Sequence, residues 1–220
     1  MELKNIFLII FGVVSVVYLF TLAKKPSMFQ FALKGCLMPL LAAFYITSAG
    51  TGNIFWPVIF ALIFAWIGDV LLVRITNILW FKLGLLSFLI GHIFYIIAMY
   101  EFIQPINITV LVISFIAAAF FGIMVYKTVK PSKQMKIPVV AYETVILLMT
   151  ISALQVFLLQ FIGSGHAFGL LIFTGSVCFL ISDTLLAIRT FRRVKIYFGV
   201  MITYIAAQLL ITLGFIATII

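Results

Sequence analysis

Continuous apolar runs, each long enough to cross a bilayer as a helix, constrain this chain more than any other feature. A helix rising 1.5 Å per residue needs about 20 residues to cross a hydrocarbon core of about 30 Å. With 66% hydrophobic and only 9% charged residues, the chain cannot cover a water-soluble surface, where about a quarter of residues are charged. Lipid cannot satisfy exposed backbone groups, and strands of a membrane barrel would alternate apolar and polar residues. The sequence therefore predicts an all-α polytopic membrane bundle.

About eight apolar runs are predicted as transmembrane helices, and they leave no room for a soluble domain or a long linker. Residues 1–220 are accordingly predicted to be a single integral membrane domain. The expected spans are 3–23, 35–49, 54–73, 79–100, 106–126, 137–160, 166–188 and 196–219.

Thirteen of the 14 basic residues lie at alternate connections between these spans. The connections near Gly50, Glu101 and Gly163 hold none. Cytoplasmic loops carry an excess of Lys and Arg, so both termini are predicted to face away from the cytoplasm. The membrane would be the bacterial inner membrane, or the endoplasmic reticulum in a eukaryote. The thirteen residues are Lys24, Lys25, Lys34, Arg74, Lys82, Lys127, Lys130, Lys133, Lys136, Arg189, Arg192, Arg193 and Lys195.

The net charge of +9 is thus interpreted as an orientation signal. A nucleic-acid partner is not expected, because no folded domain would display the basic residues as one patch. Membrane lipids are the expected surroundings of the chain.

Three of the five acidic residues, Asp69, Glu143 and Asp183, fall inside apolar runs. Helical rise places Asp69 and Asp183 about 7 to 9 Å inside the boundary marked by the arginine that follows each. An acid at mid-membrane costs roughly 2.5 to 3.5 kcal/mol, and such residues generally face the bundle interior or a wet cavity. Since Glu143 lies at a similar depth, the three predict one shared pocket.

Two carboxylates in such a pocket can divide their roles, because one can hold a proton while the other remains a base. This is the equipment for acid-catalysed hydrolysis. The alternative is that Asp69 and Asp183 pair with Arg74, Arg189 or Lys34 as interfacial anchors, since long basic side chains can reach back from helix ends.

Polar residues deeper in the membrane are candidates for the same cavity, namely His92, Tyr95, Tyr204 and Gln208. Hydrogen bonding between helices is the alternative for each. A metal site is not expected, because catalytic zinc needs three protein ligands. The other histidine, His166, begins the seventh span at the opposite face.

A short internal repeat accompanies the aspartates. Gly68-Asp69-Val70-Leu71-Leu72 and Ser182-Asp183-Thr184-Leu185-Leu186 each end a span before a basic turn, and the next span carries His92 or Gln208. Two four-helix halves in the same orientation would explain this pattern. Coincidence is the alternative reading.

In the order and spacing of these segments, the chain resembles the YhhN-like lysoplasmalogenases, which are small eight-helix membrane hydrolases. The resemblance covers most of the chain. It rests on Gly68–Leu72, Leu83-Gly84-Leu85 with Phe88, His92 and Tyr95, Ser182–Leu186, and Tyr204 with Ala206-Ala207-Gln208.

This resemblance implies hydrolysis of the vinyl ether bond of lysoplasmalogens, without a cofactor. The products would be a fatty aldehyde and glycerophosphoethanolamine or glycerophosphocholine, so a lysophospholipid in the bilayer is the expected partner. Asp69 and Asp183 would jointly supply acid–base catalysis, and Lys34 and Arg74 would hold the phosphate. The candidate substrate-binding residues are Lys34, Arg74, His92, Tyr95, Tyr142, Glu143, Tyr204 and Gln208.

Three other classes compete with this interpretation. An intramembrane aspartyl protease is disfavoured because Trp66 stands where the first Gly of its Gly-x-Gly pattern belongs. A small transporter or proton-coupled carrier would use the repeat and the buried acids, but Pro39 and Pro57 have no counterparts in the second half. A purely structural subunit would leave the insertion cost of the buried acids without a purpose.

Overall fold

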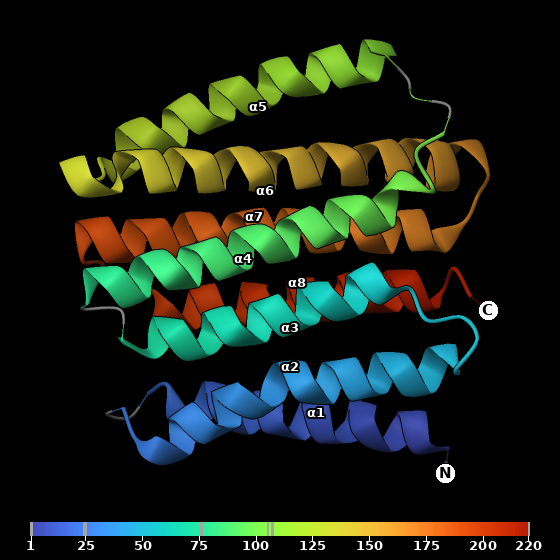
Figure 1. The fold of residues 1–220 in the computed structure, drawn as a ribbon, viewed down its shortest axis with the longest axis horizontal. Coiled ribbons are helices and arrows are strands. Elements are labelled where there is room, and N and C mark those ends of the chain that lie inside the picture. The colour runs from blue at the N-terminus through green and yellow to red at the C-terminus, as the bar shows by residue number, and fades with distance from the viewer. Residues whose placement is uncertain (1, 24–25, 75–76, 105, 107, 220) are drawn as a thin grey trace.

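The computed structural model describes residues 2–23, 26–74, 77–104, 106 and 108–219, with Arg74 described through its backbone alone. In this part of the chain all regular structure is helical. The helices lie side by side as one bundle, with both termini at the same end (Figure 1). They are α1 (Leu3–Thr21), α2 (Met28–Ala49), α3 (Trp56–Leu71), α4 (Ile78–Tyr100), α5 (Ile108–Val129), α6 (Lys136–Val156), α7 (Ala167–Arg192) and α8 (Tyr197–Ile216).

Within the described residues, seven helical stretches are long and apolar enough to cross a membrane. The remaining helix, α3, is shorter, but the 3-10 turn Leu72–Arg74 extends it. The π-helical segment Phe157–Gly163 likewise extends α6. The predicted multi-pass helical membrane protein is therefore confirmed.

Two helix boundaries differ from the predicted spans by more than three residues. The second helix begins at Met28 rather than near residue 35, and the Ser27 hydroxyl accepts a hydrogen bond from the backbone N–H of Gln30 as its cap. Lys34 thus lies inside α2 and is buried. The seventh helix runs past residue 188 to Arg192, followed by Arg193 in the left-handed conformation at φ 56°.

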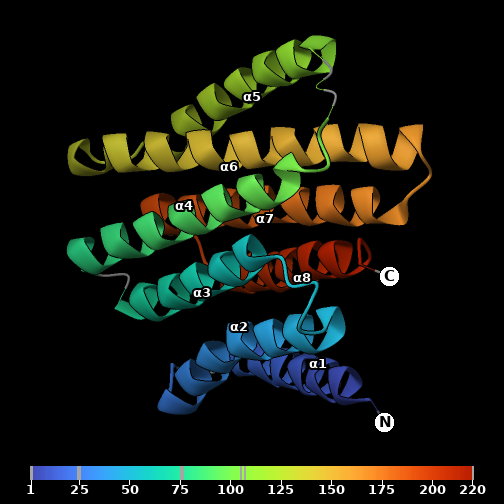
Figure 2. The same cartoon turned by 45° about the vertical axis from the view of Figure 1, so that its right-hand side comes forward.

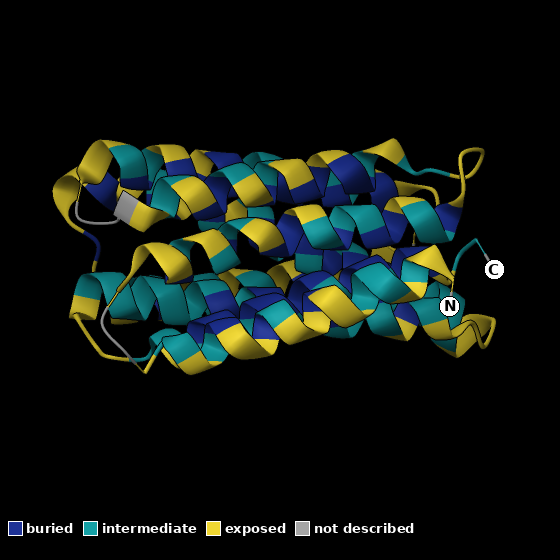
Figure 3. Ribbon diagram, turned by 90° about the horizontal axis from the view of Figure 1, so that it is seen from below, coloured by how far each residue is buried: buried dark blue, intermediate teal, exposed yellow. Residues whose placement is uncertain are grey.

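The bundle is apolar outside and carries its polar groups inside, as expected for a protein surrounded by lipid. Large apolar side chains such as Phe20, Phe120 and Ile137 are among the most exposed, whereas Asp69 and Gln208 are buried. Figure 3 shows the exposed residues along the outer helix faces. The polar interior is where a site can lie.

Close helix pairs hold the two aspartate segments in place. A Cβ atom on Gly68 of α3 would lie 2.6 Å from the Phe88 ring of α4. A Cβ on Gly175 of α7 would lie 2.9 Å from the backbone nitrogen of Ile211 on α8. Both pairs therefore depend on glycine for their separation. By contrast, α5 lies at the edge of the bundle and diverges from α6 toward its own N-terminal end (Figures 1 and 2).

Candidate functional site

Asp69, near the end of α3, is buried between a cation and a phenol. Its side chain is 3% exposed, and the Lys34 ammonium lies 3.0 Å from Oδ1. The Tyr204 hydroxyl, from α8, donates a hydrogen bond to Oδ2 at 2.7 Å. Both carboxylate oxygens are thus engaged. The ion pair with Lys34 is one of those that the anchoring alternative foresaw, although it lies inside the bundle rather than at the interface.

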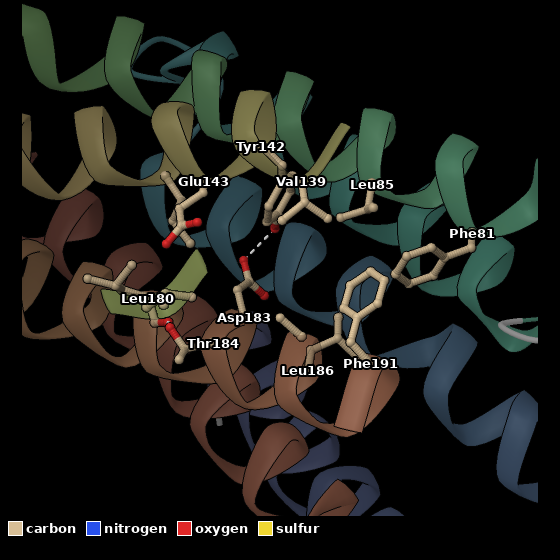
Figure 4. A pocket seen from close by; sticks show the side chains of 13 residues that line it. Phe81, Leu85, Val139, Tyr142, Glu143, Leu180, Asp183, Thr184, Leu186 and Phe191 are labelled. Atoms are coloured by element: carbon tan, nitrogen blue, oxygen red, sulfur yellow. Dashed lines mark hydrogen bonds between the residues drawn. The ribbon is translucent and has the colours of Figure 1, made fainter. Parts of the chain in front are cut away.

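Asp183, on α7, has different neighbours. The Tyr142 hydroxyl of α6 donates a hydrogen bond to Oδ2 (Figure 4), and His92 Nε2 of α4 lies 3.9 Å from the same oxygen. That imidazole nitrogen makes no hydrogen bond to the described residues. No Lys or Arg side chain that the structure describes forms an ion pair with Asp183.

Both aspartates line one space, which we call the central cavity. This arrangement follows from the repeated segments, because Asp69 and Asp183 each lie in the last turns of a helix at the same end of the bundle (Figure 1). Its lining residues are Lys34, Asp69, Leu72, Phe88, Ser182, Asp183, Leu186, Arg189, Tyr197, Val200, Met201 and Tyr204.

An apolar cavity adjoins the central cavity and shares Asp183 and Leu186 with it. Glu143 and Asp183 both project into this space, and hydrophobic side chains form most of its wall (Figure 4). The third acid therefore meets Asp183 here rather than joining both aspartates in the central cavity. The other lining residues are Phe81, Leu85, Val125, Val139, Tyr142, Ile146, Leu180, Thr184, Leu186, Ala187 and Phe191.

A wider opening, here called the cationic mouth, also adjoins the central cavity, through residues that the apolar cavity does not share. The two share Lys34, Leu72, Arg189 and Tyr197. Arg193 and Lys195 add further positive charge to the wall of the mouth. The remaining lining residues are Tyr18, Leu22, Pro26, Gln30, Phe31, Val73, Thr190, Val194 and Phe198. The three adjoining spaces therefore follow one another in order: the cationic mouth, the central cavity with the two aspartates, and the apolar cavity.

Aromatic rings fix the polar side chains around the aspartates. The His92 ring meets Phe179 edge to face, with ring centroids 4.6 Å apart. Phe179 meets the Tyr204 ring at 5.6 Å, and Phe88 meets it at 5.9 Å. Such edge-to-face packing restricts ring orientation, so the hydroxyl and the imidazole stay directed at the two carboxylates.

Not every predicted site residue lies at these cavities. His92 lies beside Asp183 but is not among the lining residues of the three spaces. The Tyr95 hydroxyl donates a hydrogen bond to Gln208 Oε1 at 2.6 Å, and neither Tyr95 nor Gln208 lines any of the three spaces. The structure places them as a pair between α4 and α8, which was the alternative reading of both. The side chain of Arg74 lies outside the described part of the structure.

Arg189 and Tyr197 were not among the predicted site residues. The Arg189 guanidinium lies over the Tyr197 ring, 4.2 Å from its centroid. The Tyr197 hydroxyl also lies 3.2 Å from that of Tyr18. In the sequence, Arg189 stands out only as a basic residue within two turns after Asp183. A membrane-orientation signal explains such a residue equally well, so it did not indicate a site.

In the described part of the chain, no group of three or more His, Cys, Asp or Glu side chains is arranged to hold a metal ion.

Comparison with known proteins gives a family for this chain. A search of the curated proteins finds no match, and neither does a search of the solved structures. The model of the YhhN family matches residues 29–215, which include both aspartates and their neighbours Lys34, His92, Tyr142 and Tyr204. By this match over most of its length, the chain belongs to the YhhN family.

Proposed function

We propose that this protein is a lysoplasmalogenase, which hydrolyses the vinyl ether bond of an alkenyl lysophospholipid. The observation that carries the proposal is the central cavity, where the buried Asp69 and the 12% exposed Asp183 lie between a cationic mouth and an apolar cavity. The YhhN family includes lysoplasmalogenases, which supports the same reaction.

The order of the three spaces suits a single-chain lipid. Its anionic headgroup belongs in the cationic mouth, and its hydrocarbon tail belongs in the apolar cavity. The vinyl ether, which joins the tail to the glycerol backbone, then lies beside Asp69 and Asp183. If the basic loops face the cytoplasm, the mouth opens to the cytoplasmic leaflet.

The reaction needs a proton donor and a base. Asp183 gives its proton to the alkene carbon, leaving an oxocarbenium ion at the carbon bonded to oxygen. Water adds to that carbon and gives up a proton to Asp69, forming a hemiacetal. Asp69 returns this proton to the glycerol oxygen as its bond to carbon breaks, the hemiacetal hydroxyl gives its proton to Asp183, and the fatty aldehyde is released. Water is consumed, and both aspartates return to their starting state.

The roles are divided by the neighbours of each aspartate. Asp69 shares an ion pair with Lys34, so its negative charge is already compensated and it suits the base. Asp183 accepts a hydrogen bond from neutral Tyr142 and borders the apolar cavity, so it suits the proton donor. A negative charge at either residue also stabilises the oxocarbenium ion.

Aldehyde release tests the proposal directly. The detergent-solubilised protein is supplied with an alkenyl lysophospholipid or, as a comparison, an acyl lysophospholipid. Asp69→Asn and Asp183→Asn should each lower the rate by at least about 100-fold, the usual contribution of one acid–base group. Glu101→Gln is the matched control, because Glu101 is exposed at the other end of the bundle.

Two results would overturn the assignment. One is undiminished aldehyde release in either aspartate variant. The other is the absence of aldehyde from wild-type protein whose helix content and monodisperse elution show that it is folded.

A further inference from the structure

The cationic mouth holds an excess of positive charge that the reaction at the aspartates does not use. Its described lining contains Lys34, Arg189, Arg193 and Lys195 but no carboxylate. Lys34 is already paired with Asp69 at 3.0 Å, so its charge is compensated. The charge available to a ligand comes from the other three residues.

Arg189 is the best placed of these three. It is half-buried, whereas Arg193 and Lys195 are exposed, and it alone of the three lines both the mouth and the central cavity. Its guanidinium rests on the Tyr197 ring at 4.2 Å. A guanidinium held by an aromatic face keeps its edge free to donate hydrogen bonds.

Arg192, also in the last turns of α7, is a useful comparison because it lies outside the three cavities. Its Nε donates a hydrogen bond to the backbone oxygen of Thr128 at 2.6 Å, and this side chain ties α7 to α5. It is exposed and lines none of the three cavities. Arg189 has no such hydrogen bond to a backbone oxygen in the described residues and instead rests on Tyr197, in the wall shared by the mouth and the central cavity.

We propose that Arg189, held on Tyr197, binds the phosphate of the lipid headgroup and sets the depth at which the lipid's reactive bond lies. Arginine donates two parallel hydrogen bonds to phosphate, which fixes orientation as well as position. Arg193 and Lys195 add positive charge at the entrance. This inference rests on the proposed function for the identity of the lipid, and it transfers the phosphate-binding role from Lys34 and Arg74 to Arg189.

The geometry of the lipid supports this assignment. Only the glycerol backbone separates the phosphate from the ether oxygen of the chain. A phosphate at Arg189, which is common to the mouth and the central cavity, leaves the ether bond inside the central cavity. A phosphate at Arg193 or Lys195 alone would keep that bond in the mouth.

A binding measurement tests the proposal without requiring turnover. The probe is a saturated alkyl lysophospholipid, which has no vinyl ether to hydrolyse, and the reference is the matching alkylglycerol without phosphate. Arg189→Gln should weaken binding of the phospholipid by at least about 10-fold, as expected for loss of a hydrogen-bonded charge. Binding of the alkylglycerol should be unchanged.

Two further variants keep the result interpretable. Arg189→Lys keeps the positive charge but loses the paired hydrogen bonds, so it should bind the phospholipid more tightly than Arg189→Gln and less tightly than the wild type. Because its net charge equals that of the wild type, the remaining loss measures the hydrogen bonds alone. Lys136→Gln removes one positive charge at an exposed position outside the three cavities. It should bind the phospholipid as the wild type does.

The outcomes separate this inference from the proposed function. Equal losses for phospholipid and alkylglycerol, or no loss in Arg189→Gln, would overturn the phosphate site even if aldehyde release persists. Displacement of the lipid by inorganic phosphate at equal concentration would also overturn it, because the site would then bind the free anion. An Arg189-dependent loss confined to the phospholipid supports the site even if no aldehyde is formed. If the protein does hydrolyse the lipid, Arg189→Gln should raise KM far more than it lowers kcat.

Discussion

Asp69 and Asp183 occupy corresponding places in the two halves of the chain, yet their surroundings differ in charge. The second helix of each half supplies one neighbour, Lys34 from α2 to Asp69 and Tyr142 from α6 to Asp183. The first is a cation and the second a neutral phenol. The neighbour on α2 therefore compensates a negative charge, whereas the neighbour on α6 only donates a hydrogen bond.

The last helix of each half contacts the aspartate of the opposite half. Tyr204 of α8 bonds to Asp69 of α3, and His92 of α4 lies beside Asp183 of α7. Each aspartate is thus completed by both halves, so neither half forms the site alone. This exchange explains why the two carboxylates share one cavity while keeping separate partners.

The largest effect on stability should come from removing the cation beside Asp69, which is Lys34. Lys34→Met leaves the Asp69 carboxylate buried and unpaired, which typically costs about 3–5 kcal/mol. We expect a large fall in unfolding temperature in detergent. Lys34→Met combined with Asp69→Asn should recover most of the loss, because the uncompensated charge is gone.

Lys136→Met serves as the control for this experiment, since it removes a lysine that is exposed at the start of α6. A Lys34→Met protein as stable as the control, or a double variant no more stable than the single one, would mean that the two aspartates do not differ in charge compensation.

A smaller effect is expected from the two phenols. Tyr204→Phe removes a hydrogen bond to the ion-paired Asp69, and bonds to charged groups contribute about 1.5–3 kcal/mol. Tyr142→Phe should cost less, about 0.5–1.5 kcal/mol, if Asp183 is protonated in the resting protein, as the proposed mechanism requires. Unfolding midpoints of the two variants measured side by side decide the order. The reverse order would exchange the proposed roles of acid and base.

Much of the fold could be predicted because apolar runs of membrane length report directly on spanning helices. The position of Asp69 and Asp183 toward the ends of their helices could also be predicted, since each lies in an apolar run shortly before a basic turn. Lys34 was harder. It was placed before the second helix because it is charged, and its burial depends on a partner in α3 that the local sequence does not reveal.

The facing of side chains could not be predicted from the sequence. Tyr95 and Gln208 carry the same kind of signal as His92 and Tyr204, a polar residue in an apolar helix. Which of them lies beside an aspartate depends on how α4 and α8 are rotated against their neighbours, and the glycine contacts at Gly68 and Gly175 help to set that rotation. Arg189 was not predicted as a site residue for the same reason, because the sequence does not show that it faces the central cavity.

The smallest effect should come from Tyr95→Phe, which tests how the halves are joined rather than how the aspartates differ. The variant removes the bond from Tyr95 to Gln208, and hydrogen bonds between membrane helices contribute about 0.6 kcal/mol on average and at most about 1.7. A small fall in stability with aldehyde release retained would confirm a structural pair. Tyr100→Phe is the control, because Tyr100 is exposed on the same helix.

Loss of aldehyde release in Tyr95→Phe at unchanged stability would have a different meaning. The pair would then act on the reaction through α4 and α8, the two helices that carry His92 and Tyr204 to the aspartates. A shift of either helix would alter both carboxylates at once, because each helix completes the aspartate of the opposite half. The contrast between Asp69 and Asp183 would in that case depend on helix position as much as on the charge of Lys34.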